Sequence, residues 1–219
     1  MSSQSLVVDY YLGITSPWAY MGHRRLRDIA RRTGATINVL PVDLGGKIFP
    51  VSGGLPVAKR APQRLAYRLT ELKRYSDYLG IPLKVQPTYF PLSSDDAAQL
   101  VIAVDRKDGI EQALDLAELI MKSLWTDDRN VDDPKVLAEL LDVAGLPPER
   151  MDESHTQAVH EQYEADSQKA IEIGVFGSPT YVIEGELFWG QDRLDFVERR
   201  LRREHAASVD AASQQRPAT

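Results

Sequence analysis

Ser16-Pro17-Trp18-Ala19 has the spacing of a redox motif in which both sulfur-bearing residues have been replaced. The motif lies between an apolar run over residues 6–12, which predicts a buried strand, and residues 18–32, which predict a helix. Redox proteins often place Cys-x-x-Cys at such a strand-to-helix corner, because the helix N-terminus stabilises a thiolate there. Here Ser16 and Ala19 occupy the two cysteine positions, and the chain contains no cysteine. A corner suited to a thiolate, in a chain without a thiol, suggests that the thiol arrives with a ligand.

Ser16 has two compatible roles at this corner. A serine followed by a proline most often caps a helix, with the proline at the first helical position. The same hydroxyl can donate a hydrogen bond to a bound sulfur atom, while the helix end favours negative charge. Both effects would lower the pKa of a ligand thiol and leave more of it as the nucleophilic thiolate.

Composition limits the class of protein. The chain has 219 residues, of which 43% are hydrophobic and 26% are charged, enough for one large domain or two modest ones. Its net charge of −6 disfavours non-specific binding to nucleic acid. One basic run, over residues 23–27, is interpreted as a solvated helix face. The histidines show no pattern of metal ligands and cysteine is absent, so we predict no metal site.

No segment of the sequence predicts contact with a membrane. No apolar run reaches the roughly 20 residues that cross a bilayer. Residues 1–5 carry no basic residue ahead of an apolar core, so they do not resemble a signal peptide. We therefore expect a cytoplasmic protein that binds neither membranes nor nucleic acid.

The elements that position the Ser16 corner begin with a second strand over residues 36–42. Strand, helix and strand at this spacing make a βαβ unit, in which the two strands are parallel. From about residue 62 to residue 174 the pattern is helical, and its last part, over residues 154–173, predicts one long polar helix.

Strand character returns near the end of the chain. Residues 180–183 and 187–189 predict a hairpin, with Glu184-Gly185-Glu186 as its turn. A final helix is expected from about residue 193 to residue 204. The two ends of the chain therefore supply the parts of one small mixed sheet with flanking helices.

This order of elements predicts an α/β protein with a thioredoxin-like fold and an inserted all-helical domain, as in DsbA-like proteins. The thioredoxin-like domain would be discontinuous, over residues 1–45 and 174–205. The helical domain would occupy residues 46–173, and residues 206–219 would form a disordered tail.

Four motifs carry a closer resemblance: 15–20, 78–83, 175–180 and 188–194. In this order, over residues 6–203, they resemble the 2-hydroxychromene-2-carboxylate isomerases. These enzymes are similar to kappa-class glutathione transferases and lie in the DsbA-like branch of the thioredoxin superfamily. The resemblance implies that glutathione is the cofactor.

The resemblance also implies roles for individual residues. Ser16 would hold the catalytic position and contact the sulfur of glutathione. Pro179 would be a cis-proline that faces the active site, so that the Ser178 backbone pairs with the cysteinyl backbone of glutathione as an added strand would. Gln191 and Asp192 would receive the γ-glutamyl end, whose carboxylate binds helix N–H groups while its ammonium pairs with Asp192. The structural alternatives are a strand-initiating proline at 179 and a helix cap at 192.

The aromatic substrate would lie near Ser16, between the two domains. Its lining is predicted on weaker grounds, because aromatic residues are more often simply core: Trp18, Phe49, Tyr89 and Phe90. Gly53 stands where relatives often carry an asparagine that contacts glutathione. How the glycyl end of glutathione is held is therefore left open.

The activity that the resemblance implies is the interconversion of 2-hydroxychromene-2-carboxylate and trans-o-hydroxybenzylidenepyruvate in the degradation of naphthalene-type compounds. A homodimer is implied in the same way. Two alternatives stand beside it. One is a kappa-like glutathione transferase or peroxidase, and the other is a redox-inactive thioredoxin-like module that holds extended peptides at the Pro179 loop.

Overall fold

A mixed four-stranded sheet forms the centre of the structure, a computed structural model that describes residues 6–203. Its strands are β1 (Val7–Leu12), β2 (Thr36–Pro41), β3 (Thr180–Ile183) and β4 (Glu186–Trp189). They lie in the order β2-β1-β3-β4, with β1 parallel to β2 and the other neighbours antiparallel. The predicted sheet, built from both ends of the chain, is confirmed. The predicted tail over 206–219 lies outside the described residues.

Helices connect and cover these strands. In chain order they are α1 (Pro17–Thr33), α2 (Phe49–Ser52), α3 (Pro62–Leu79), α4 (Asp95–Asp108), α5 (Ile110–Trp125), α6 (Pro134–Val143), α7 (Arg150–Ser154) and α8 (Gln157–Glu172). Short π-helical and 3₁₀ turns cover Leu44–Ile48 (η1), Val57–Lys59 (η2) and Gln191–Arg193 (η3), and a last helix runs over 194–203. Within residues 6–203, no helix has both the length and the apolar character needed to cross a membrane.

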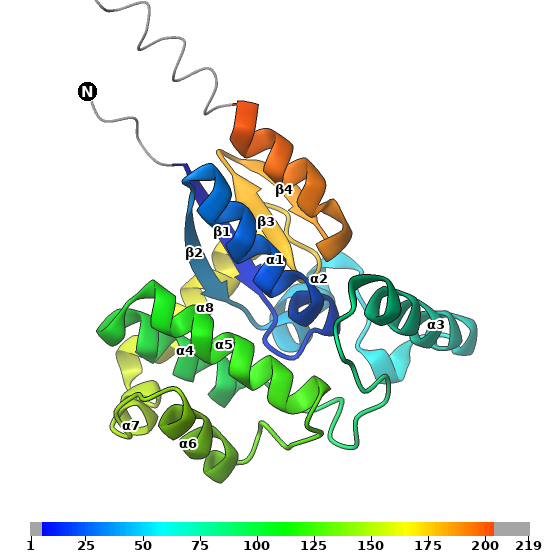
Figure 1. The fold of residues 1–219 in the computed structure, drawn as a ribbon. Coiled ribbons are helices and arrows are strands. Elements are labelled where there is room, and N and C mark those ends of the chain that lie inside the picture. The colour runs from blue at the N-terminus through cyan, green and yellow to red at the C-terminus, as the bar shows by residue number, and fades with distance from the viewer. Residues whose placement is uncertain (1–5, 204–219) are drawn as a thin grey trace, which may run out of the picture.

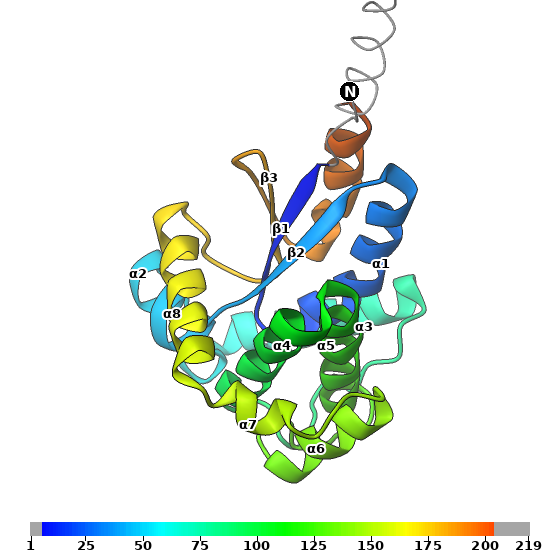
Figure 2. The same cartoon turned by 90° about the vertical axis from the view of Figure 1, so that its left-hand side faces the viewer.

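Helices pack on both faces of the sheet. α1 and the last helix lie on one face (Figure 1), and α8 lies on the other (Figure 2). The strands can support both layers because alternate side chains point to opposite faces. In β1, Tyr10 and Leu12 join the main core with α1, whereas Tyr11 joins a smaller core that includes Ala170 of α8. β1 is therefore buried on both faces, as its apolar run predicts.

α5 connects the helical segment to α1. Arg27 of α1 donates hydrogen bonds to Asp115 at 2.5 Å and to Glu111 at 2.9 Å, both on α5. Only 14% of the Arg27 side chain is exposed. The interpretation of residues 23–27 as a solvated helix face is therefore wrong at Arg27, which the carboxylates of α5 cover, and at His23, which is buried.

The predicted helix over residues 154–173 is also wrong near its start. α7 ends at Ser154, and α8 begins at Gln157. The hydroxyls of Ser154 and Thr156 donate to backbone carbonyls three residues earlier, at 2.7 and 2.8 Å. Such local side-chain bonds compete with a continuing helix. α8 packs on β2, and the predicted division of the chain into two domains stays a prediction.

His23 is a buried polar link between α1, β1 and α5. Its Nε2 lies 3.0 Å from the Leu114 carbonyl oxygen, and its Nδ1 lies 3.4 Å from the Tyr10 hydroxyl. A carbonyl only accepts, so Nε2 carries the proton and Nδ1 accepts from Tyr10. Burial, and then the positive charge of Arg27, lower the pKa of His23 to about 4. The folded protein therefore holds His23 neutral.

This burial predicts a loss of stability in mild acid. His23 protonates in the unfolded chain below about pH 6.5 but resists protonation in the fold. Stability from neutral His23 is therefore lost progressively as the pH falls from about 6.5 to about 4. In urea titrations, the free energy of unfolding of the wild type should fall by roughly 1–3 kcal/mol more than that of His23→Gln as the pH is lowered through this window. The exposed His160→Gln is the control. A constant difference between wild type and His23→Gln would contradict the assignment.

Candidate functional site

Ser16 caps α1. It has an extended backbone (φ −78°, ψ 123°), and its Oγ accepts a hydrogen bond from the Ala19 N–H at 3.3 Å. Pro17 occupies the start of the helix, where no N–H is required. The Trp18 N–H donates to no backbone carbonyl or side chain among the described residues. The predicted capping role is confirmed, and the positive end of α1 presents an unused donor beside Ser16.

The Ser16 hydroxyl reaches the loop before β3. Its Oγ donates a hydrogen bond to the Ser178 carbonyl oxygen at 3.0 Å. The peptide bond between Ser178 and Pro179 is cis. The structure thus brings together two predicted site segments that lie far apart in the sequence. It also gives the Ser16 proton an acceptor, so this proton must turn away from Ser178 before it can meet a ligand atom.

The Ser178 side chain has a structural role. Its Oγ accepts a hydrogen bond from the Gly13 N–H at 2.7 Å and lies 3.4 Å from the Tyr11 carbonyl oxygen, to which it donates. Both bonds are buried and join the loop to the end of β1. The hydroxyl is therefore committed to the fold, whereas the backbone of Ser178 faces Ser16.

Gln191 is held beneath α1. The Gly190 N–H donates to the Pro179 carbonyl oxygen at 2.8 Å, which ties this turn to the same loop. Arg25 of α1 then donates to Gln191 Oε1 at 2.5 Å and to its carbonyl oxygen at 3.2 Å. Gln191 is buried, and both of its oxygen atoms are in use. It positions the turn, and its side-chain NH₂ group makes no hydrogen bond with the described residues.

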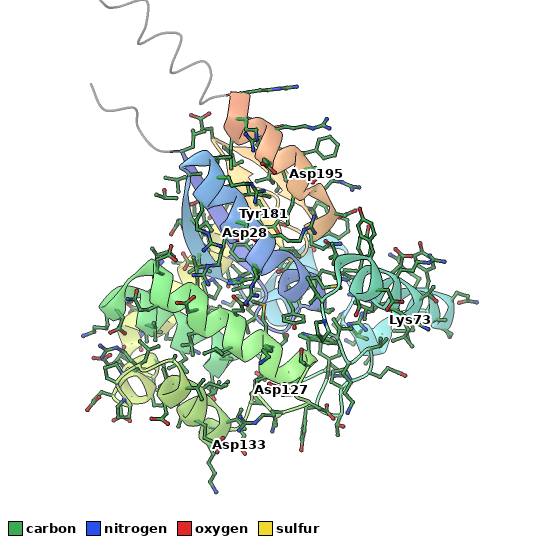
Figure 3. All side chains as sticks on the ribbon, in the orientation of Figure 1. Asp28, Lys73, Asp127, Asp133, Tyr181 and Asp195 are labelled. Carbon is green, nitrogen blue, oxygen red and sulfur yellow. The ribbon has the colours of Figure 1, made fainter. Side chains whose placement is uncertain are left out.

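α1 can approach Gln191 and β3 closely because residue 22 is glycine. A Cβ at Gly22 would lie 2.7 Å from the Tyr181 hydroxyl and 3.0 Å from Gln191 Cβ. Figure 3 shows Tyr181 where α1 and the last helix meet over the sheet. The Gln191 turn is thus packed against α1 as well as bonded to it.

Asp192 is exposed in the 3₁₀ turn that precedes the last helix. Its Oδ2 accepts a hydrogen bond from the guanidinium of Arg193 at 2.7 Å. The sequence predicts that the last helix begins at about residue 193, and the structure adds the η3 turn over Gln191–Arg193 immediately before that helix. The turn presents one carboxylate and one guanidinium side by side.

Tyr75 of α3 connects Asp192 with Trp18. Burial and the negative charges of Asp192 and Glu71 raise the pKa of Tyr75. Its ring and the Trp18 ring meet edge to face, with 5.7 Å between the ring centres. A shallow depression of about 290 Å³ lies along this part of α3, lined by Glu71, Arg74, Tyr75 and Tyr78. Trp18 and Asp192 therefore border one region beside the start of α1.

The other predicted lining residues are spread more widely. Phe90 is half-buried and packs on Trp125, with 4.9 Å between ring centres. Phe49 begins α2 and packs against Gly54, where an added Cβ would lie 2.3 Å from its ring. Tyr89 is 45% exposed. The structure gives these three residues no shared cavity, and their role as substrate lining stays a prediction.

Sequence reasoning missed three residues around this region. Arg25 lies in the basic run that was interpreted as a solvated face, and its bond to Gln191 carries no local signal. Tyr75 lies in the stretch with a helical pattern, which predicts a helix but no contact with Trp18. Arg68, on the same helix, has no neighbour in the sequence that indicates its contacts with Phe90 and Trp125. Each gains its partners from packing between distant elements.

Comparisons with known proteins agree with this architecture. A family model of the DSBA-like thioredoxin domain matches residues 7–202. A 2-hydroxychromene-2-carboxylate isomerase from Sphingobium xenophagum is 27% identical over 89% of this chain and 97% of the relative. A solved structure of 2-hydroxychromene-2-carboxylate isomerase superposes with a TM-score of 0.81 at 25% identity, covering 94% of this chain and 98% of that one. The predicted resemblance and the predicted fold class are confirmed.

A more distant structure shares the fold. The cytosolic disulfide reductase DsbM from Pseudomonas aeruginosa, solved with GSH, superposes with a TM-score of 0.65 at 19% identity. It covers 90% of this chain, and all of its own chain is covered.

The Ser178 hydroxyl predicts a measurable loss of stability on truncation. Ser178→Ala leaves the buried Gly13 N–H without its acceptor, so the free energy of unfolding should fall by about 1–3 kcal/mol in urea titrations. The control is Ser93→Ala, because Ser93 is exposed and should change stability little. If both variants are equally stable, the Ser178 side chain does not hold the loop.

Proposed function

The chain belongs to the DSBA-like thioredoxin family, and we propose that it is a glutathione-dependent isomerase. Its reaction would interconvert 2-hydroxychromene-2-carboxylate and trans-o-hydroxybenzylidenepyruvate, as part of the degradation of naphthalene-type compounds. The similarity to isomerases over most of the chain supports this assignment. By the same resemblance we propose a homodimer, and we propose the cytoplasmic location that the sequence predicts.

One observation carries the proposal. The hydroxyl of Ser16 lies at the positive end of α1, against the loop with the cis Ser178-Pro179 bond, in a chain that contains no cysteine. This geometry can stabilise a thiolate but cannot supply one. A tripeptide thiol would supply the missing sulfur. Its sulfur and its two ends can be bound by different parts of the site.

The residues around Ser16 fit glutathione. The unused Trp18 N–H and the Ser16 hydroxyl are donors suited to a thiolate. The adjacent charges of Asp192 and Arg193 match the ammonium and the carboxylate of the γ-glutamyl end. Gln191 is buried, and Arg25 of α1 bonds to it. The fold therefore sets the distance between Ser16, where the sulfur would bind, and Asp192, where the γ-glutamyl end would bind.

When bound, glutathione would supply a thiolate that adds reversibly to the unsaturated substrate, so that the ring opens, a former double bond rotates and the thiol is then released. Ser16 would turn its hydroxyl from the Ser178 carbonyl to the sulfur atom and lower the pKa of the thiol. The end of α1 adds a favourable potential for the same negative charge. The thiol is not consumed, so the protein contributes charge stabilisation and orientation.

Turnover is the direct test. The chromene carboxylate should isomerise only when glutathione is present, and the change in its absorbance measures this reaction. The glutathione concentration should stay constant during turnover. Consumption of glutathione would instead identify a transferase or peroxidase. Ser16→Ala should lower kcat by roughly 10- to 100-fold, the value of one hydrogen bond to a charged group.

A second variant separates activation from capping. Ser16→Gly also lacks the hydroxyl, yet glycine at a helix cap costs only a few tenths of a kcal/mol relative to serine. If the hydroxyl activates the thiol, both variants lose activity and raise the pKa of the bound thiol, measured by ultraviolet thiolate absorbance. Activity that survives in Ser16→Gly would reduce Ser16 to a helix cap.

Binding of the γ-glutamyl end can be tested without turnover. Asp192→Ala removes the carboxylate that is expected to meet the ligand ammonium, and glutathione should bind about 3- to 10-fold more weakly in calorimetry. Asp195→Ala removes an exposed carboxylate from the last helix and is the matched control. If the wild type binds no glutathione at millimolar concentration, both the isomerase hypothesis and the transferase or peroxidase hypothesis are wrong.

A further inference from the structure

Arg68 lies over an aromatic platform. Its guanidinium carbon is 5.1 Å from the centre of the Phe90 ring and 5.9 Å from the centre of the Trp125 ring. The two rings are themselves packed together. Cation–π contacts of this kind hold a guanidinium in one place. Arg68 is half-buried, so its guanidinium is fixed and still within reach of a ligand.

Arg68 has no ionic partner among the described residues. Other well-covered arginines do: Arg27 pairs with Asp115 and Glu111, and Arg150 pairs with Asp108 and Glu153. Burial, and then the positive charge of Arg60, lower the pKa of Arg68 to about 10, so it remains a cation at neutral pH. Its fork of N–H donors makes no hydrogen bond with the described residues.

The platform carries a second unused donor. Trp125 is fully buried, and its indole Nε1 has no hydrogen-bond partner among the described residues. A buried N–H without an acceptor is uncommon and calls for an explanation. Arg68 and Trp125 thus bring together a cation and an N–H donor, neither of which has an acceptor among the described residues. This chemistry suits an anion.

The platform adjoins the start of α1. Trp125 is followed by Thr126, whose hydroxyl oxygen lies 2.9 Å from the Tyr20 hydroxyl, and the Tyr20 N–H donates to the Ser16 carbonyl. On the other side, Tyr75 contacts Trp18 and lies two helical turns after Arg68, roughly 10 Å along the axis of α3. Residues seven apart share one face of a helix. Arg68 and Ser16 therefore flank the same region.

We propose that Arg68 binds the carboxylate of the substrate, an aryl α-keto acid or its cyclic hemiketal form. The inference rests on the proposed function, which supplies a carboxylate-bearing aromatic substrate. The guanidinium pairs with the carboxylate through two parallel N–H donors. Phe90, beneath the guanidinium, then lies beside the substrate rather than merely in the core.

The proposed reaction brings two anions together, and the positive charge of Arg68 would reduce their repulsion. A thiolate and a substrate carboxylate are both anions, and bringing them close together with little water between them is unfavourable. The end of α1 can offset only the charge of the thiolate, because its effect falls off within the first turn. A separate cation for the carboxylate lowers the repulsion and orients the conjugated chain.

Direct binding tests the proposal independently of turnover. The probe is 4-(2-hydroxyphenyl)-2-oxobutanoate, which keeps the carboxylate but has no double bond to isomerise. Its partner, 4-(2-hydroxyphenyl)butan-2-one, lacks the carboxylate. In calorimetry, Arg68→Met should bind the keto acid about 10- to 100-fold more weakly than the wild type does. Its affinity for the ketone should stay within about twofold of the wild-type value. Arg68→Lys should recover only part of the loss, because lysine lacks the planar fork.

Controls separate the possible failures. Arg64→Met removes an exposed charge one turn earlier on α3 and should change keto-acid binding less than about twofold. Circular dichroism and thermal unfolding establish that each variant is folded. Glutathione binding should be the same in wild type and Arg68→Met. Arg68-dependent binding of the keto acid without any isomerase activity would support the carboxylate subsite and reject the proposed reaction.

Three outcomes would overturn the proposal. The first is a wild type that binds the keto acid no better than the ketone. The second is an equal loss of affinity for the keto acid and for the ketone in Arg68→Met, which would indicate that Arg68 has a packing role. The third is a loss confined to glutathione, which would assign Arg68 to the glycyl carboxylate of the tripeptide.

Discussion

The arrangement of the site depends on the hydrogen bonds that hold the loop before β3, and one of them, from the Ser16 hydroxyl to the Ser178 carbonyl, joins residues 162 positions apart. This bond fixes the start of α1 against the loop that leads into β3. The Ser178 hydroxyl fastens the same loop to the end of β1, and Gly190 fastens the next turn to Pro179. One corner therefore sets the relative positions of the helix end, the loop and the Asp192 turn.

This corner is supported from below by the packing of α5 against α1. Arg27 and His23 carry the contact, the first through carboxylates of α5 and the second through the Leu114 carbonyl. Because α5 ends at Trp125, the same packing also decides where the Arg68 platform lies relative to Ser16. The packing of the helical segment on α1 thus positions the Arg68 platform as well as supporting the Ser16 corner.

The parts of this structure that could be predicted from the sequence are those with local causes. Ser16 before Pro17 specifies a helix cap, and the left-handed backbone of Glu184 and Gly185 suits the predicted hairpin turn. The break at Ser154 was missed because side-chain bonds to the backbone, rather than apolar spacing, end that helix. The partners of Arg25, Arg27 and Arg68 depend on which helix faces meet, and a single sequence carries no signal for that.

The arginines that lie around this site divide into two physical kinds. Arg25 and Arg27 have their donors occupied by the fold, so they stabilise the contact of α1 with Gln191 and with α5. Arg68 is stabilised by aromatic rings, which hold the cation without using its N–H groups. An ion pair would have fixed the guanidinium equally well, but it would have left no donor for a ligand. Anchoring by rings keeps the charge in place and its hydrogen bonds available, which is the condition that a carboxylate-binding residue must satisfy.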